Sequence, residues 1–91
     1  MVGPVMPRSI AMVVLRPNAN APIPVAVDCL AGEQVIGGGT TVTTSDPTES
    51  RFHLLSDGPT PTGWLGIAAA TGRFGPGVTL TVTTTVFCLA A

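Results

Sequence analysis

The sequence contains few charged residues, and it has no lysine and no tyrosine. Only 10% of its 91 residues are charged, and four arginines stand against five acidic residues, which gives a net charge of -1. An ordinary soluble domain has about 25% charged residues. Because there is no basic excess and the arginines are scattered, we expect the chain not to bind nucleic acid.

Metal-ligating residues and long apolar runs are also scarce. One histidine and two cysteines are too few for a four-ligand zinc site within one chain. The sequence also lacks a Cys-x-x-Cys pair, so it has no redox motif of that kind. We therefore expect no metal and no cofactor. The sequence has no run of 18 apolar residues, so we expect no membrane-spanning helix. The apolar start has no early positive charge, so we expect no secretory signal and no cleaved leader.

Glycine, proline and threonine are abundant instead. The chain has 11 Gly, 9 Pro and 13 Thr, and 45% of its residues are hydrophobic. Threonine and valine favour pleated strands over helices, and turn residues recur about every ten positions. This pattern predicts an all-β fold: a small antiparallel β-sandwich of about six or seven strands with an extended N-terminal arm.

Alternating apolar residues divide the chain into a short arm and one domain. We expect a single β-sandwich domain over 10–91, with strands at 10–15, 23–29, 34–45, 51–55, 64–70 and 78–89. The last segment alternates most clearly, with valine, leucine and cysteine in one phase and threonine in the other. Pro24 cannot donate to a ladder, which predicts that its strand lies at an edge or opens irregularly. Residues 46–49 and 57–63 are rich in turn residues and are expected to be loops.

The arm is expected to cover residues 1–9. Two prolines forbid a helix there, and its apolar residues are Met1, Val2, Val5 and Met6. Two interpretations are equally compatible with this content. The arm frays in water, or it packs on a neighbouring subunit and serves as a partner-binding segment.

Cys29 and Cys88 both fall on the apolar phase of their expected strands. They are candidates for one disulfide, which would close a loop of about 60 residues and stabilise the fold by roughly 4 kcal/mol. The alternative is two buried free thiols that pack as small hydrophobic residues. A disulfide would indicate an oxidising setting outside a cytoplasm.

Candidate catalytic residues do not form a recognisable constellation. His53 lies near serines and aspartates in the sequence, but nothing in their spacing predicts a triad, and we expect a surface histidine. A chain of this size also lacks a cleft to hold a sugar between two carboxylates. We expect no enzymatic activity and no catalytic residue.

Two further features have a structural and a functional interpretation. Gly37, Gly38 and Gly39 lack the ending of a phosphate-binding loop and indicate a backbone bend, a bulge or a close approach. Trp64, the only tryptophan, is a core residue or a platform for a ligand such as a sugar ring.

The segment Cys29–Gly39, with sequence CLAGEQVIGGG, resembles a C-P-A-G-x-x-V-x-G-G-G motif. This motif opens a small two-cysteine β-domain found in actinobacterial secreted proteins and in virion surface proteins of actinobacteriophages. Ser56, Pro59 and Gly63-Trp64 match the continuation of the pattern, and Cys88 matches its second cysteine. Leu30 replaces the usual proline, and Asp57 stands where an aromatic residue often follows the serine. The resemblance spans residues 10–91 and implies a non-enzymatic β-sandwich module.

The resemblance and the composition together favour a structural virion protein of a bacteriophage. We expect a head decoration protein, which would bind the major capsid protein or another virion protein and form a homo-oligomer. It would be assembled in the host cytoplasm and located in the virion. The alternatives are a minor tail or fibre component, or a secreted extracellular surface domain that binds carbohydrate, such as a host surface glycan, or protein.

Overall fold

The computed structural model describes residues 5–90 and is all-β, as the composition predicts. Within that range it has six strands and no helix, so no helix has the length and apolar content to cross a membrane. The strands are β1 (Val5–Leu15), β2 (Ile23–Asp28), β3 (Gln34–Thr44), β4 (Phe52–Pro59), β5 (Gly63–Ala70) and β6 (Thr79–Leu89).

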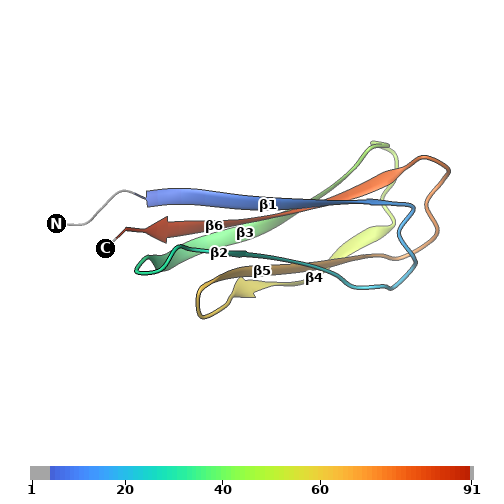
Figure 1. The fold of residues 1–91 in the computed structure, drawn as a ribbon. Helices are drawn as coiled ribbons and strands as arrows, with labels where there is room; N and C mark the ends of the chain where they lie inside the picture. The colour runs from blue at the N-terminus through green and yellow to red at the C-terminus, as the bar shows by residue number, and fades with distance from the viewer. Residues whose placement is uncertain (1–4, 91) are drawn as a thin grey trace.

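The strands form two antiparallel sheets of three strands each, stacked face to face (Figure 1). Sheet A has the order β1-β6-β3, and sheet B has the order β2-β5-β4. Each sheet therefore has a central strand with an edge strand on either side. The sandwich is narrow and elongated, with extents of 51 × 19 × 16 Å. The position of β2 at an edge agrees with the expectation from Pro24.

The core lies between the two central strands and is built mainly from every second residue of β6. Leu80, Val82, Thr84, Val86 and Cys88 are fully buried, which matches the period-two pattern of this segment. Across the interface, sheet B contributes the buried residues Ile23, Val25, Val27, Ala68 and Ala70. The outward residues of β6 from Thr79 to Thr85 are threonines, which explains their regular spacing in the sequence.

The expected boundary between arm and domain at residue 9 is wrong for residues 5–9. These residues belong to β1 and pair with β6 of the same chain, from Val5 opposite Leu89 to Ser9 opposite Thr85. The pairing satisfies backbone groups that an isolated arm would leave to water. Met1 and Val2 lie outside the described residues, whereas Val5 and Met6 are exposed on β1.

The expected loop at 57–63 is also shorter than predicted, because β4 continues through Asp57, Gly58 and Pro59. Pro59 is tolerated for a geometric reason. Thr60 donates its N–H to the carbonyl of Gly63 (3.0 Å), so the neighbouring position 59 directs its backbone away from β5 in the alternating ladder. The missing N–H of proline is therefore not needed there. The same argument applies to Pro24, since Cys29 donates to Thr62 (2.8 Å) and even-numbered residues of β2 face the free edge.

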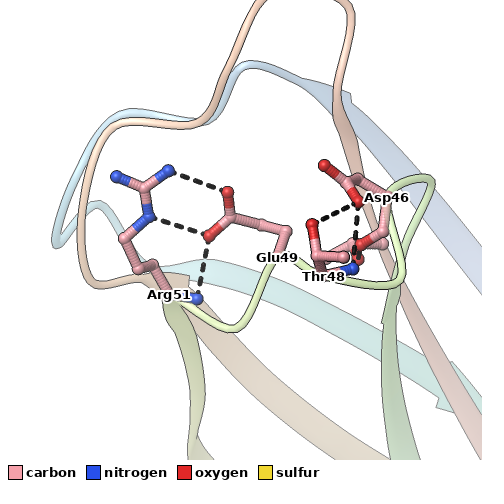
Figure 2. A network of polar contacts seen from close by, with 5 residues as sticks. Asp46, Thr48, Glu49 and Arg51 are labelled. Carbon is pink, nitrogen blue, oxygen red and sulfur yellow. Dashed lines mark hydrogen bonds and ion pairs between the residues drawn. The ribbon is translucent and has the colours of Figure 1, made fainter.

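The connection from β3 to β4 is held by a local polar network (Figure 2). Asp46 accepts hydrogen bonds from the backbone N–H and the hydroxyl of Thr48 (2.9 and 2.7 Å). Glu49 accepts two bonds from the guanidinium of Arg51 (2.9 and 2.8 Å) and one from its backbone N–H. These bonds lower the pKa of Glu49 to about 2, with the Arg51 side chain as the largest cause. The predicted turn at 46–49 is confirmed.

Candidate functional site

His53 and the acidic residues around it in the sequence are not brought into a reactive arrangement. His53 is exposed on β4, and its side chain has no hydrogen bond or ion pair within residues 5–90. Asp46 is engaged by Thr48, and Asp57 by Thr40 and Trp64. These carboxylates hold local structure, and neither orients the imidazole.

The two cysteines form a disulfide, as the first of the two interpretations predicted. The bond joins the residue after β2 to the buried end of β6, with the Cα atoms 5.8 Å apart. It therefore ties sheet B to sheet A at the end where β6 finishes. A carboxylate oxygen of Glu33 lies within 4.8 Å of both sulfur atoms. In the disulfide the sulfurs are not thiolates, so this group of three has no metal-binding thiolate.

An ion pair lies beside the disulfide. The guanidinium of Arg8 in β1 donates two bonds to the carboxylate of Glu33, at 3.3 and 3.0 Å. Leu30 donates its backbone N–H to the same carboxylate (2.7 Å). The Arg8 bond is the main cause of a lowered pKa of Glu33, and the Leu30 bond adds to it. The pair joins β1 to the turn between β2 and β3.

Trp64 packs inside the sandwich on one side and reaches a carboxylate on the other. Its ring packs against the buried cluster of Val27, Val86 and Cys88. Its Nε1 donates a hydrogen bond to Oδ1 of Asp57 (2.6 Å). The indole thus closes one end of the core, which agrees with the core interpretation of this residue.

The glycine triplet combines a bulge with a close approach. The register of β3 against β6 shifts between Val35 and Gly37, which leaves Ile36 as the extra, exposed residue. At Gly38, a Cβ atom would lie 2.5 Å from Cδ2 of Trp64, whereas Gly39 has open space at that position. This segment therefore contains two of the three features expected of the triplet, a bulge and a close approach.

An open hollow of about 480 Å³ lies at the end of the sandwich opposite the disulfide, between two loops. It is lined by Arg16, Pro17, Asn18, Ala19, Arg73 and Phe74. Within residues 5–90, Arg16 and Arg73 make no ion pair, whereas the other two arginines are paired with glutamates. No sequence signal indicated this hollow, because its two arginines are 57 positions apart and only the packing of the two loops joins them.

The outward face of sheet A carries no charged side chain in the described strands. The register places on it every second residue of β1 from Val5 to Leu15, of β6 from Thr79 to Leu89 and of β3 from Gly37 to Thr43. Threonines of β6 form the middle row, and Ser9 and Thr85 share a hydrogen bond (2.7 Å). Arg8, the one charged residue of β1, points to the opposite face.

Large apolar side chains are exposed mainly on one strand of this sheet. Six of the eleven exposed large hydrophobic residues belong to β1: Val5, Met6, Ile10, Met12, Val13 and Leu15. Val13 and Leu15 are 63% and 62% exposed. The sequence interpretation identified Val5 and Met6 as partner-binding candidates, but it did not extend that role to the second half of β1.

Comparisons with protein-family models, with curated proteins and with solved structures find no match to this chain.

Proposed function

We propose that this protein is a non-enzymatic structural component of a bacteriophage particle, a head decoration protein that lies on the capsid surface. The observation that carries the proposal is the uncharged outward face of sheet A, which runs along the whole 11-residue length of β1 and β6. The sequence resemblance to virion surface modules supports the same role.

The composition of this face fits a protein partner. The cores of protein interfaces are depleted in charged residues, because a buried unpaired charge is costly. Val13, Leu15 and Phe87 supply exposed apolar area, and the threonine row supplies hydroxyls that donate and accept hydrogen bonds. The proposed partner is the major capsid protein or another virion protein.

The disulfide supports a role outside a cell. A disulfide that joins the two sheets stabilises the fold in an oxidising environment, where it is not reduced. A bacteriophage particle outside its host is in such an environment. The disulfide and the outward face are equally compatible with a minor tail or fibre component. Whether the protein binds the head or the tail of the particle distinguishes this role from head decoration.

The hollow between Arg16 and Arg73 favours a second candidate, a secreted surface domain. Two guanidinium groups without a carboxylate partner in the described residues suit an anionic ligand, since arginine binds carboxylate and phosphate groups in a fork geometry. An acidic host surface glycan is the ligand class that this candidate predicts.

Co-sedimentation tests the proposal. The purified chain is mixed with purified bacteriophage particles or with cell envelopes, and bound copies are counted after centrifugation. We expect saturation at a fixed copy number per capsid. A chain that stays in the supernatant but binds cell-wall glycan would replace the virion role with the surface-domain role.

A pair of variants locates the bound face. Thr83 lies in the centre of the outward face of sheet A, flanked by Ala11 and Thr41. Thr83→Lys places a charge there and should weaken particle binding by at least about tenfold. Ser56→Lys adds the same charge at an exposed position of sheet B and should bind like the wild type. Equal weakening by both variants would contradict the assignment to sheet A.

A further inference from the structure

The outer edge of β1 presents a row of free backbone groups. Arg16 donates its N–H to the carbonyl of Val78 (3.1 Å), and the register continues from this pair without a shift to Val5 opposite Leu89. In an antiparallel ladder, bonded and non-bonded positions alternate. Even-numbered residues of β1 therefore bond to β6, and the odd-numbered ones direct their N–H and C=O groups outward.

Pro7 divides this edge into two parts. It occupies an outward position, so the edge lacks one donor there. Beyond it, Ser9, Ala11, Val13 and Leu15 each present both a donor and an acceptor. The longest unbroken stretch of free edge in β1 is therefore Ser9–Leu15, and it contains no charged residue. Exposed uncharged edges of this kind are templates for strand addition.

Apart from Ser9, the side chains of this stretch are apolar on both faces of the sheet. Val13 and Leu15 are exposed on the outward face. Ile10 and Met12 share the inward phase of Val14, but they are not buried against sheet B and stay 48% and 44% exposed. An edge strand with uncovered apolar residues on both faces suits a partner that continues the sheet and covers both faces at once.

We propose that a second copy of this chain pairs with it through β1, antiparallel and centred on Met12. In this register Ser9 bonds opposite Leu15 of the second copy, and Ala11 opposite its Val13. The two-fold symmetry repeats both pairs, so all four outward residues of each stretch are bonded. The two Met12 residues meet at the centre as a non-bonded pair, with Cα atoms about 4.5 Å apart. The product is one six-stranded sheet with the order β3-β6-β1-β1-β6-β3.

The centre at Met12 follows from the proline and from the charges. If the second copy were shifted by two residues toward the N-terminus of β1, Pro7 would lie opposite Leu15, and one backbone hydrogen bond would be lost on each side. In the Met12 register, Pro7 stays outside the paired stretch. Arg8 would lie opposite Arg16 of the second copy at each end, but Glu33 neutralises Arg8, and Arg16 leaves the extended conformation with a φ of 49°.

The other edges fit a second copy less well. Pro24 in β2 and Pro59 in β4 remove outward donors, and β4 also has a register shift between Leu54 and Ser56. The outer edge of β3 has the bulge at Ile36, and the hydroxyl of Thr40 is committed to Asp57 in sheet B. Among the described strands, only the Ser9–Leu15 stretch of β1 combines an unbroken free backbone edge with exposed apolar side chains on both faces.

The test is the oligomeric state of the free chain, measured by sedimentation equilibrium. The wild type should be a dimer in exchange with monomer. Met12→Asp and Met12→Lys each place two like charges at the symmetry centre and should raise the dimer dissociation constant at least about tenfold. An equimolar mixture of the two variants pairs opposite charges and should restore the dimer. Thr41→Asp, at the other edge of sheet A, is the matched control and should dimerise like the wild type.

A backbone variant tests the strand pairing itself. Ala11→Pro removes an outward donor that β6 does not use, and Pro7 shows that the strand accepts proline at such a position. It should be monomeric with the circular dichroism of the wild type. A wild type that is monomeric at all concentrations, or a dimer that survives both Ala11→Pro and Met12→Asp, would overturn the proposal. The inference goes beyond the proposed function: no particle is present in this test, so its failure is distinct from failure to bind a capsid.

Discussion

Gly38 in β3 and Trp64 in β5 are in direct contact across the two sheets. A Cβ atom on Gly38 would lie 2.5 Å from Cδ2 of Trp64 and 2.6 Å from the backbone oxygen of Thr85. The absence of a side chain on one strand therefore makes room for the largest side chain on the other. This complementarity lets the indole close the end of the core beside the disulfide.

Gly38→Ala should destabilise the fold by about 1–3 kcal/mol, because the added methyl group meets a ring and a backbone oxygen that cannot both move away. Gly39→Ala is the matched control in the same strand. Its Cβ would have no neighbour within 4 Å, so stability should change little or rise slightly. Denaturant unfolding followed by Trp64 fluorescence measures both. Equal stability of the two variants would show that the contact is not restrictive.

The hydrogen bond from Trp64 to Asp57 belongs to a polar chain that joins the sheets. Thr40 has one hydroxyl proton and donates it to Asp57 (3.0 Å), so the buried Thr84 is the donor in its contact with Thr40 (3.5 Å). Asp57→Ala should lower the free energy of unfolding by about 1 kcal/mol. The loss is limited because position 57 is exposed, so water can accept the hydrogen bonds of Trp64 and Thr40 in place of the carboxylate.

A double-mutant cycle with Trp64→Phe isolates the contribution of the indole bond. Phenylalanine keeps most of the ring and loses the N–H, so the coupling free energy between the two substitutions should be about 0.5–1.5 kcal/mol. Additive costs in chemical unfolding would mean that the bond at 2.6 Å adds no net stability.

Removal of the disulfide should lower the free energy of unfolding by about 4 kcal/mol, because the 59-residue separation of its cysteines leaves a long loop unconstrained in the unfolded chain. The double variant Cys29→Ala/Cys88→Ala, compared with the oxidised wild type in denaturant, measures this difference. The reduced wild type is the second control, because it keeps the buried sulfur volume. A loss below about 1 kcal/mol in both would contradict the chain-entropy argument.

Acid should weaken the turn between β3 and β4 within a defined pH window. The pKa of Glu49 is about 2 in the folded protein, against an ordinary value of 4.5. A lowered folded pKa stabilises the fold above the unfolded pKa, and this contribution is lost as pH falls from about 4.5 toward 2. Unfolding measured from pH 6 to pH 2 should show a shallower decline in Glu49→Gln than in the wild type.

Part of the acid response should survive in Glu49→Gln, because hydrogen bonds also lower the pKa values of Glu33 and Asp46. A carboxyl titration by NMR identifies the group directly. In Arg51→Leu the pKa of Glu49 should rise toward its ordinary value, since the Arg51 side chain is the largest cause of the shift. An unchanged titration in that variant would assign the shift to the backbone bonds instead.

Several elements could be predicted from local pattern alone. The alternation of 78–89 predicts which residues of β6 are buried, because side-chain direction in a strand has a period of two. The same phase argument places Cys29 and Cys88 inward and makes their disulfide one of two open outcomes. Proline positions predict edges wherever a ladder would need the missing N–H, as at Pro24.

Other features depend on what each segment meets. β1 begins at Val5 rather than at residue 10 because β6 is long enough to pair with it, and β4 runs through Asp57-Gly58-Pro59 because β5 continues beside it. The lengths of the partner strands β6 and β5 cannot be read from the residues near these two boundaries. A prediction from local turn-forming residues therefore placed both boundaries wrongly.

The sequence by itself determined the all-β class, the buried phase of β6 and the residues able to form a disulfide, since these follow from composition and from the two-residue period of a strand. Only the tertiary structure decided that Gly38 faces Trp64, that Arg16 and Arg73 line one hollow, and that β1 has a free apolar edge. These relationships join residues far apart in the chain, and stacking and pairing of the sheets bring them together.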